Sequence, residues 1–128
     1  MRVLLVEENQ VFRKNFKAVL CARFPGMQIQ EAWSPHQATQ MLEAQEVDLA
    51  FVDIQFSEGS GLDLSRRIKS MWPCCSVVMV GPHDLPEYRE AAEKSGASSF
   101  MCKDKTDLSE IEKLVKYLCS NWEEKHTP

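Results

Sequence analysis

The chain has 128 residues, of which 44% are hydrophobic and 27% are charged, and its formal net charge is −4 at pH 7. This size and balance predict one globular domain over residues 1–122, with residues 123–128 as a flexible tail or the start of a linker. The negative charge argues against direct nucleic-acid binding, which needs a basic face. Because no apolar stretch approaches the roughly 20 residues that span a bilayer, no membrane contact is expected.

The five cysteines are an odd number and show no C-x-x-C spacing, so the sequence predicts neither a disulfide framework nor a zinc site. Cys102 precedes a lysine, and we interpret it as a small buried strand residue rather than a reactive thiol. Reduced thiols, together with an N-terminus that lacks the layout of a signal peptide, indicate a cytoplasmic location.

Strands and helices are predicted to alternate from the start of the chain. Val3–Val6 is a continuous apolar run, and the helix after it carries apolar residues from Phe12 to Phe24, until Pro25-Gly26 ends it. Met27–Gln30 alternates between apolar and polar residues, as an edge strand does. Ser34-Pro35 then supplies an N-cap and a first-turn proline for the second helix.

The same alternation continues in the second half. Leu49–Val52 and Val77–Val80 are again continuous apolar runs, which are typical of central parallel strands buried on both faces. The apolar spacing predicts a third helix from about Leu62 to Met71 between these two strands. A fourth helix is expected from about Pro86 to Ser95, and a weaker strand from about Ser98 to Cys102.

The last helix is expected to begin near Asp107. Its buried stripe is predicted to consist of Leu108, Ile111, Leu114, Val115 and Leu118. Five strand–helix repeats with short connections predict an α/β fold of the flavodoxin-like (βα)5 type, a three-layer sandwich with right-handed crossovers. Because the second strand alternates, it suits an edge position, and the parallel sheet is expected in the order 2-1-3-4-5.

Charged side chains follow three of the predicted strands. Glu7 and Glu8 follow the first strand, Asp53 ends the third, and Lys103 follows the fifth. In an open parallel sheet the carboxyl ends of the strands form the ligand crevice, so these side chains are expected to meet there. An ionised carboxylate is costly to bury without a partner. Three acids and one lysine in a single crevice would suit a divalent cation and a phosphoryl group.

Each of these residues also has a purely structural interpretation. Asp53 could cap the following loop, Glu7 and Glu8 could be a solvated pair before an Asn9 N-cap, and Lys103 could be a surface lysine. Taken one at a time, these residues leave both interpretations open. Because four independent coincidences would be needed at one crevice, the functional interpretation is favoured for the set.

Five sequence motifs occur in the order and at the spacing of a known family. They are VLLVEEN at 3–9, DLAFVDI at 48–54, GLDL at 61–64, VVMV at 77–80 and GASSFMCKD at 96–104. Over nearly all of residues 2–120, the chain resembles the receiver domains of two-component response regulators. The resemblance implies reversible phosphorylation, with a histidine kinase or a phosphotransfer protein as the phosphoryl donor.

The resemblance also assigns roles to the residues at the strand ends. Asp53 is expected to be the nucleophile that becomes an acyl phosphate, and Lys103 to pair with the phosphoryl oxygens. The implied cofactor is Mg²⁺, with Glu7, Glu8, Asp53 and the backbone carbonyl of Gln55 as ligands. The domain is not expected to be an enzyme, beyond promoting its own phosphoryl transfer and dephosphorylation.

Three positions depart from the family pattern. Glu8 stands where aspartate is usual, and its extra methylene is expected to weaken Mg²⁺ binding. Gly81 stands where a threonine or serine hydroxyl is usual, so the hydroxyl switch cannot operate through this residue. His83 could be a substitute donor, although an exposed loop histidine is the simpler interpretation. Phe100 occupies the aromatic switch position without a tyrosine hydroxyl.

These departures leave two main hypotheses. The first is a phosphoryl-accepting signalling receiver, and the second is a degenerate receiver that acts as a phosphorylation-independent protein-interaction module. A small hydrolase is least supported, because no phosphate-binding loop or nucleophile elbow is present. A homodimer could form through the face made by helix 4, strand 5 and helix 5, or through helices 1 and 5.

Overall fold

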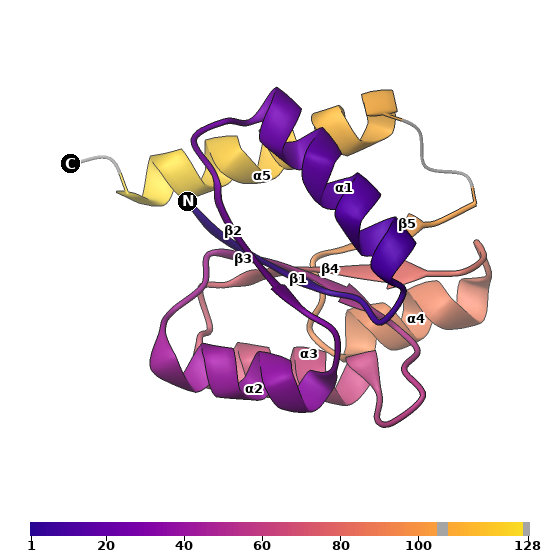
Figure 1. Cartoon of the computed structure of the whole chain (residues 1–128). Coiled ribbons are helices and arrows are strands. Elements are labelled where there is room, and N and C mark those ends of the chain that lie inside the picture. Colours follow the sequence, from indigo (N-terminus) through magenta and orange to yellow (C-terminus); the bar gives the residue numbers. More distant parts are fainter. Residues whose placement is uncertain (105–107, 127–128) are drawn as a thin grey trace.

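The computed structural model describes residues 1–104 and 108–126 of the chain. Strands and helices alternate throughout (Figure 1). In chain order they are β1 (Arg2–Val6), α1 (Gln10–Arg23), β2 (Gln28–Ala32), α2 (Pro35–Ala44), β3 (Leu49–Asp53), α3 (Gly61–Met71), β4 (Ser76–Gly81), α4 (Pro86–Lys94), β5 (Ser99–Cys102) and α5 (Leu108–His126).

All five strands form one parallel sheet in the order β2-β1-β3-β4-β5, so the predicted fold class and strand order are confirmed. The register brings the carboxyl ends of the strands to one edge of the sheet. Val6 lies opposite Val52, Asp53 opposite Val80, and Gly81 opposite Cys102. Residues that directly follow these strands therefore start from the same rim.

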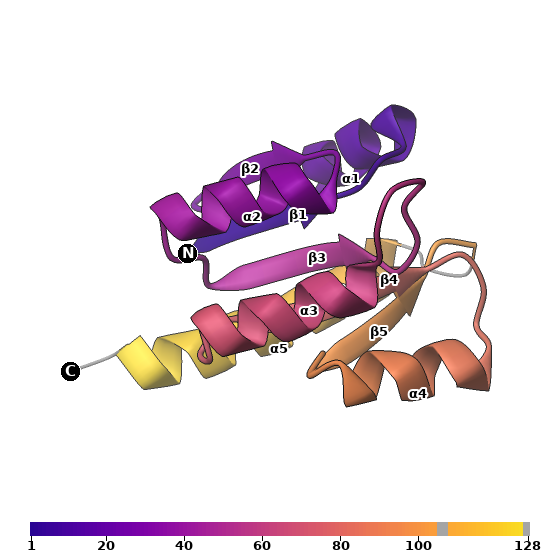
Figure 2. The same ribbon diagram turned by 90° about the horizontal axis from the view of Figure 1, so that it is seen from below.

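Helices cover both faces of the sheet and complete the three layers. Helices α1 and α5 lie on one face, and α2, α3 and α4 lie on the other, which is the face seen in front of the sheet in Figure 2. The protein has a hydrophobic core on each face of the sheet. Successive side chains of a strand point to opposite faces and therefore contribute in turn to the two cores. Leu5 and Phe51 pack with α1 and α5, whereas Leu4 and Val52 pack with α2 and α3.

The predicted elements occur with small shifts at their ends. The edge strand β2 runs from Gln28 to Ala32, later than the predicted Met27–Gln30, and Asn9 and Ser34 are the expected N-caps. Cys102 is buried in β5, as predicted. Among the described helices, none is long and apolar enough to cross a bilayer.

The last helix differs more from the prediction. It continues to His126, so residues 123–126 are helical instead of belonging to the expected tail. Ile111, Val115 and Leu118 are buried and pack on the sheet as predicted. The expected start near Asp107, the side chain of Leu108 and residues 127–128 lie outside the described residues.

The loop between β3 and α3 is held close to the end of β3 by two glycines. Gly59 has a φ of 109°, in the left-handed region that glycine adopts without strain. At Gly61 a Cβ atom would overlap the backbone carbonyl of Asp53, so only glycine lets α3 begin this close to the strand end. The position of Asp53 is therefore coupled to the start of α3.

Replacing Gly61 by alanine is expected to lower the free energy of unfolding by about 1–3 kcal/mol, because the methyl group forces the start of α3 away from Asp53. Urea unfolding at neutral pH measures this loss. Gly26→Ala is the matched control, since a Cβ at Gly26 meets no atom within 4 Å. Equal stabilities of the two variants would contradict the close approach.

Candidate functional site

The predicted site residues Glu7, Asp53 and Lys103 meet at the carboxyl edge of the sheet. Glu7 directly follows β1, Asp53 ends β3 and Lys103 directly follows β5. Two backbone hydrogen bonds fix these positions: the amide of Glu7 donates to Ala32 (3.0 Å) and the amide of Lys103 donates to Gly81 (2.9 Å). The three side chains are thus carried by the sheet rather than by long loops.

The ammonium group of Lys103 bridges the two carboxylates. Its Nζ atom lies 3.0 Å from Oδ2 of Asp53 and also forms an ion pair with Oε1 of Glu7. Both acids are buried, with exposed fractions of 6% for Glu7 and 7% for Asp53. Asp53 Oδ1 accepts a further hydrogen bond from the amide of Gln55 (3.1 Å). Each oxygen of the predicted nucleophile therefore has a donor.

The charges of this cluster influence one another. Burial raises the pKa of Glu7, and the neighbouring Asp53 carboxylate raises it further. Burial by itself would lower the pKa of Lys103, but its bonds to Glu7 and Asp53 outweigh that effect and the pKa is raised. Lys103 also lies over the ring of Phe12, 4.6 Å from its centroid, in a cation–π contact. The lysine is consequently held as a cation in the middle of the site.

Glu8 does not join this cluster. Its side chain is exposed and accepts two hydrogen bonds from Ser57, one from the amide (3.0 Å) and a short one from the hydroxyl. These bonds lower the pKa of Glu8. Within the described part of the chain, no three His, Cys, Asp or Glu side chains gather closely enough to hold a metal ion. Glu8 is thus engaged by Ser57, and the three predicted carboxylates do not form such a group among the described residues.

Two of the predicted ligands, Glu7 and Asp53, remain together at the site. Glu7 and Asp53 are adjacent buried carboxylates, and their closeness is the reason that Asp53 raises the pKa of Glu7. Mg²⁺ keeps several waters and needs only one or two protein carboxylates beside a phosphoryl group. Gln55, whose carbonyl is the predicted third ligand, is tied to Asp53 through its amide. Glu7 and Asp53 are thus the carboxylates that could hold a cation here, and the carbonyl of Gln55 stays a predicted ligand.

Gly81 and Phe100 are packed directly against each other. A Cβ atom built on Gly81 would lie 2.6 Å from Cζ and 2.8 Å from Cε2 of Phe100. The guanidinium carbon of Arg89 lies 5.1 Å from the centroid of the same ring. The Phe100 ring therefore occupies the space that a threonine or serine side chain at position 81 would need.

His83, the predicted substitute donor, contacts a different partner. Its Nδ1 atom lies 3.3 Å from Oδ2 of Asp104, and its side chain is 65% exposed. No contact between the described side chains joins His83 to Asp53. The simpler interpretation, an exposed loop histidine, fits this position better than the donor role.

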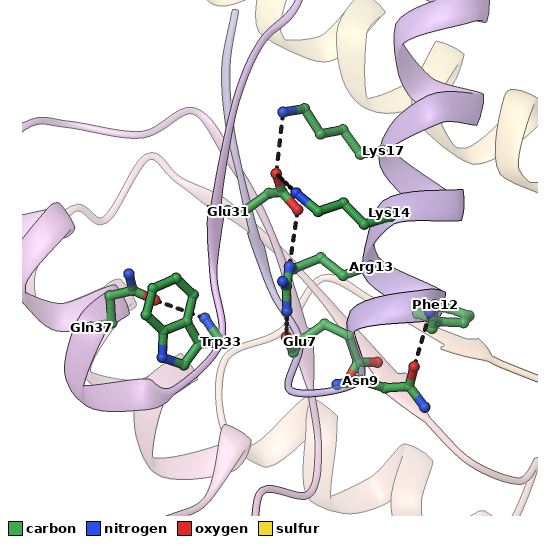
Figure 3. Close-up of polar contacts among 9 residues, drawn as sticks. All are labelled: Glu7, Asn9, Phe12, Arg13, Lys14, Lys17, Glu31, Trp33 and Gln37. Atoms are coloured by element: carbon green, nitrogen blue, oxygen red, sulfur yellow. Dashed lines mark hydrogen bonds and ion pairs between the residues drawn. The ribbon is translucent and has the colours of Figure 1, made fainter.

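A charged cluster beside the site was not predicted from the sequence. Glu31 on β2 accepts hydrogen bonds from three side chains of α1, as Figure 3 shows. They are Arg13 (2.9 Å), Lys14 (3.0 Å) and Lys17 (3.2 Å). Burial alone would raise the pKa of Glu31, but the three cations outweigh it and lower the pKa to about 2.

Sequence reasoning also missed the roles of Phe12, Arg13 and Ser57. Phe12 was predicted only as an apolar residue of the first helix, although its ring contacts Lys103. The sequence did hold a sign of the role of Arg13, because this residue lies on the apolar face of α1, between Phe12 and Phe16. A charged side chain that is buried on such a face needs an oppositely charged partner. For Ser57 the sequence carries no such signal.

The chain belongs to the response regulator receiver domain family, whose model matches residues 3–116. This match confirms the resemblance on which the site assignments were based. The fold agrees as well. A CheY-like response regulator receiver domain protein from Methanospirillum hungatei superimposes with a TM-score of 0.82 at 21% identity, covering 96% of this chain and 97% of that one.

Two curated relatives show that similar sequences occur within longer proteins. The alginate biosynthesis transcriptional regulatory protein AlgB of Pseudomonas putida is 29% identical over 102 residues, which are 80% of this chain and 22% of the relative. The DNA-binding transcriptional activator DevR/DosR of Mycobacterium tuberculosis is 27% identical over 116 residues, or 91% of this chain and 53% of the relative. The chain thus spans between about a fifth and a half of these relatives.

The lowered pKa of Glu31 predicts a pH-dependent contribution to stability. Because the pKa falls from an ordinary 4.5 to about 2 on folding, the contribution is present above pH 4.5 and is lost as the pH falls towards 2. Glu31→Gln is expected to cost about 1 kcal/mol at pH 7, after allowance for solvent screening.

Urea unfolding at several pH values between 7 and 3 measures this difference, which should shrink as the pH falls. The control is Glu43→Gln, which removes an exposed carboxylate from α2. A constant difference between wild type and Glu31→Gln over this range would contradict the assignment.

Proposed function

We propose that the domain is a phosphorelay receiver that accepts a phosphoryl group on Asp53 from a histidine kinase or a phosphotransfer protein. The observation that carries this proposal is the 3.0 Å contact between Lys103 Nζ and Asp53 Oδ2, at the carboxyl edge of the sheet. A lysine at this distance neutralises the nucleophile and can pair with the oxygens of the group that the nucleophile receives. Membership of the receiver family supports the same assignment.

The chemistry follows from these two side chains. An oxygen of Asp53 attacks the phosphorus of a phosphohistidine, an O–P bond forms, and the P–N bond breaks as the donor imidazole leaves with the electron pair. Phosphoryl transfer depends mainly on positioning and on neutralisation of charge. Lys103 and the Gln55 amide hold the carboxylate in place, and Lys103 neutralises part of the added charge.

We include Mg²⁺ in this proposal, held by Glu7, Asp53 and the Gln55 carbonyl. When bound, the cation adds positive charge for the phosphoryl oxygens and so complements Lys103. Glu8 could contribute only after it leaves Ser57, which is the physical reason to expect weaker binding than in receivers with a shorter acid at this position.

The remaining assignments are parts of the same proposal. The domain does not act as an enzyme on other substrates, but at most promotes its own phosphoryl transfer and dephosphorylation. It works in the cytoplasm and binds protein partners rather than nucleic acid directly, although one relative is named as DNA-binding. A homodimer would use the face of α4, β5 and α5, or helices α1 and α5.

Acetyl phosphate with Mg²⁺ is expected to add the mass of one phosphoryl group to the wild-type chain, because Asp53 is the acceptor. Intact-protein mass spectrometry measures the gain, and Asp53→Asn should abolish it. Asp63→Asn, which changes an exposed aspartate of α3, is the matched control and should react like wild type. The gain should also disappear when the metal is chelated. Modification of Asp53→Asn, or no modification of wild type, would reject the proposal.

A second function, a phosphorylation-independent interaction module, is favoured by the contact between Gly81 and Phe100. In a receiver that switches through this aromatic residue, the ring has to change position when Asp53 is modified. Here the ring already fills the space over Gly81, and Arg89 lies on it. A ring that is held in one position would present the same binding face with or without phosphate.

Fluorine NMR on the chain labelled with fluorophenylalanine distinguishes the two functions. The resonance of Phe100 is assigned from its loss in Phe100→Leu. If the ring is fixed, this resonance should stay in place when acetyl phosphate and Mg²⁺ are added. Gly81→Ala is the positive control, because its methyl group must displace the ring without any phosphate. A Phe100 resonance that moves on phosphorylation of wild type would exclude the second function.

A further inference from the structure

Arg13, on the first turns of α1, links the acidic loop after β1 to the edge strand β2. We propose that Arg13 is a positioning residue for the phosphoacceptor site: it fixes the backbone at Glu7 and thereby the carboxylate that shares Lys103 with Asp53. Glu31 on β2 is its anchor. The proposal rests on the function proposed above and adds to it a residue that touches none of the reacting atoms.

The first step is the contact with the loop. The Nη1 atom of Arg13 donates to the backbone carbonyl of Glu7 at 2.7 Å, and the arginine is only 7% exposed. A carbonyl held in this way fixes the orientation of the peptide group between Glu7 and Glu8. Because the peptide group is planar, its orientation constrains ψ of Glu7 and φ of Glu8, and so the backbone from which both side chains start.

The second step leads from the backbone to the carboxylate. Two residues after Glu7, the amide of Asn9 turns back and donates to Oε2 of Glu7 at 3.1 Å. The other oxygen of Glu7, Oε1, pairs with Lys103. The Glu7 carboxylate is therefore held by its own loop on one side and by the lysine on the other. A change in the loop at the point where Arg13 binds would alter both contacts.

The third step is the anchor. The Nε atom of Arg13 donates to Oε1 of Glu31 at 2.9 Å, so the two ends of one rigid guanidinium reach the loop and the strand. Lys14 and Lys17 bind the other oxygen of Glu31, as Figure 3 shows. The three cations lower the pKa of Glu31, so the anchor also stays ionised at mildly acidic pH. The geometry thus fixes Arg13 at a definite place instead of leaving it to sample solvent.

The cluster itself offers a matched pair of variants. Lys17 binds the same carboxylate as Arg13, and none of the described contacts joins it to the acidic loop. Lys17→Met therefore removes one of the positive charges that bind Glu31, and it leaves the hydrogen bond between Arg13 and the Glu7 carbonyl in place. Arg13→Lys keeps the charge, but a single ammonium cannot reproduce the fork that spans the loop and the strand. Comparison of the two separates positioning of the loop from a general contribution of charge.

The first measurement is the NMR chemical shift of the Asn9 amide, with neither metal nor phosphoryl donor present. The amide signal should move in Arg13→Lys towards the shift of a solvent-exposed amide, because the loop that aims it at Glu7 is released. It should stay in place in Lys17→Met. Circular dichroism and urea unfolding confirm that each variant is folded. An unchanged Asn9 signal in folded Arg13→Lys would overturn the proposal.

The second measurement is the rate at which acetyl phosphate with Mg²⁺ modifies Asp53. Misplacement of a site by a distant substitution reduces rates by roughly ten- to a hundredfold, and we expect a loss in this range for Arg13→Lys but not for Lys17→Met. Equal rates for the two variants would overturn the positioning role. If wild type is not modified at all, the proposed function fails, while the Asn9 signal still decides whether Arg13 positions the loop.

Discussion

One ammonium group placed between two buried carboxylates is the interaction on which this site depends. Glu7 and Asp53 are both almost fully buried at the rim of the sheet, where two uncompensated negative charges would be costly. Lys103 compensates both, and the Phe12 ring lies against its cationic end. The same arrangement leaves Asp53 close to a positive charge. The ion pairs that offset the burial of the two carboxylates therefore also place a cation where an anionic ligand of Asp53 would bind.

The sheet makes this arrangement possible with little help from the loops. Parallel strands in register deliver their carboxyl ends to one edge, and each of the three charged residues lies at or directly after such an end. Two further constraints refine the positions. Gly61 lets α3 begin directly against the backbone of Asp53, and Arg13 ties the loop after β1 to Glu31. The sheet therefore brings the three charged residues together, and the contacts of Gly61 and Arg13 fix the backbone on which Asp53 and Glu7 lie.

The sequence predicted the fold, the strand order and the meeting of Glu7, Asp53 and Lys103, because these follow from hydrophobic periodicity and from the rule that parallel strands share one carboxyl edge. It did not predict where Glu8 points, since that depends on a local hydrogen bond with Ser57. Residues 123–128 were expected to form a flexible tail or the start of a linker. Glutamate and lysine are good helix formers, however, and the helix continues to His126.

Because Gly81 and Phe100 are in direct contact, the side chain that fits at one of these positions depends on the residue at the other. A side chain at 81 and the ring in its observed place exclude each other, since the added Cβ would lie 2.6 Å from a ring carbon. A hydroxyl cannot therefore be restored at 81 by a single substitution without moving the ring off its support on Arg89. A substitution at 81 alone is therefore expected to overpack this contact, and a smaller side chain at 100 alone is expected to leave a cavity beside Gly81.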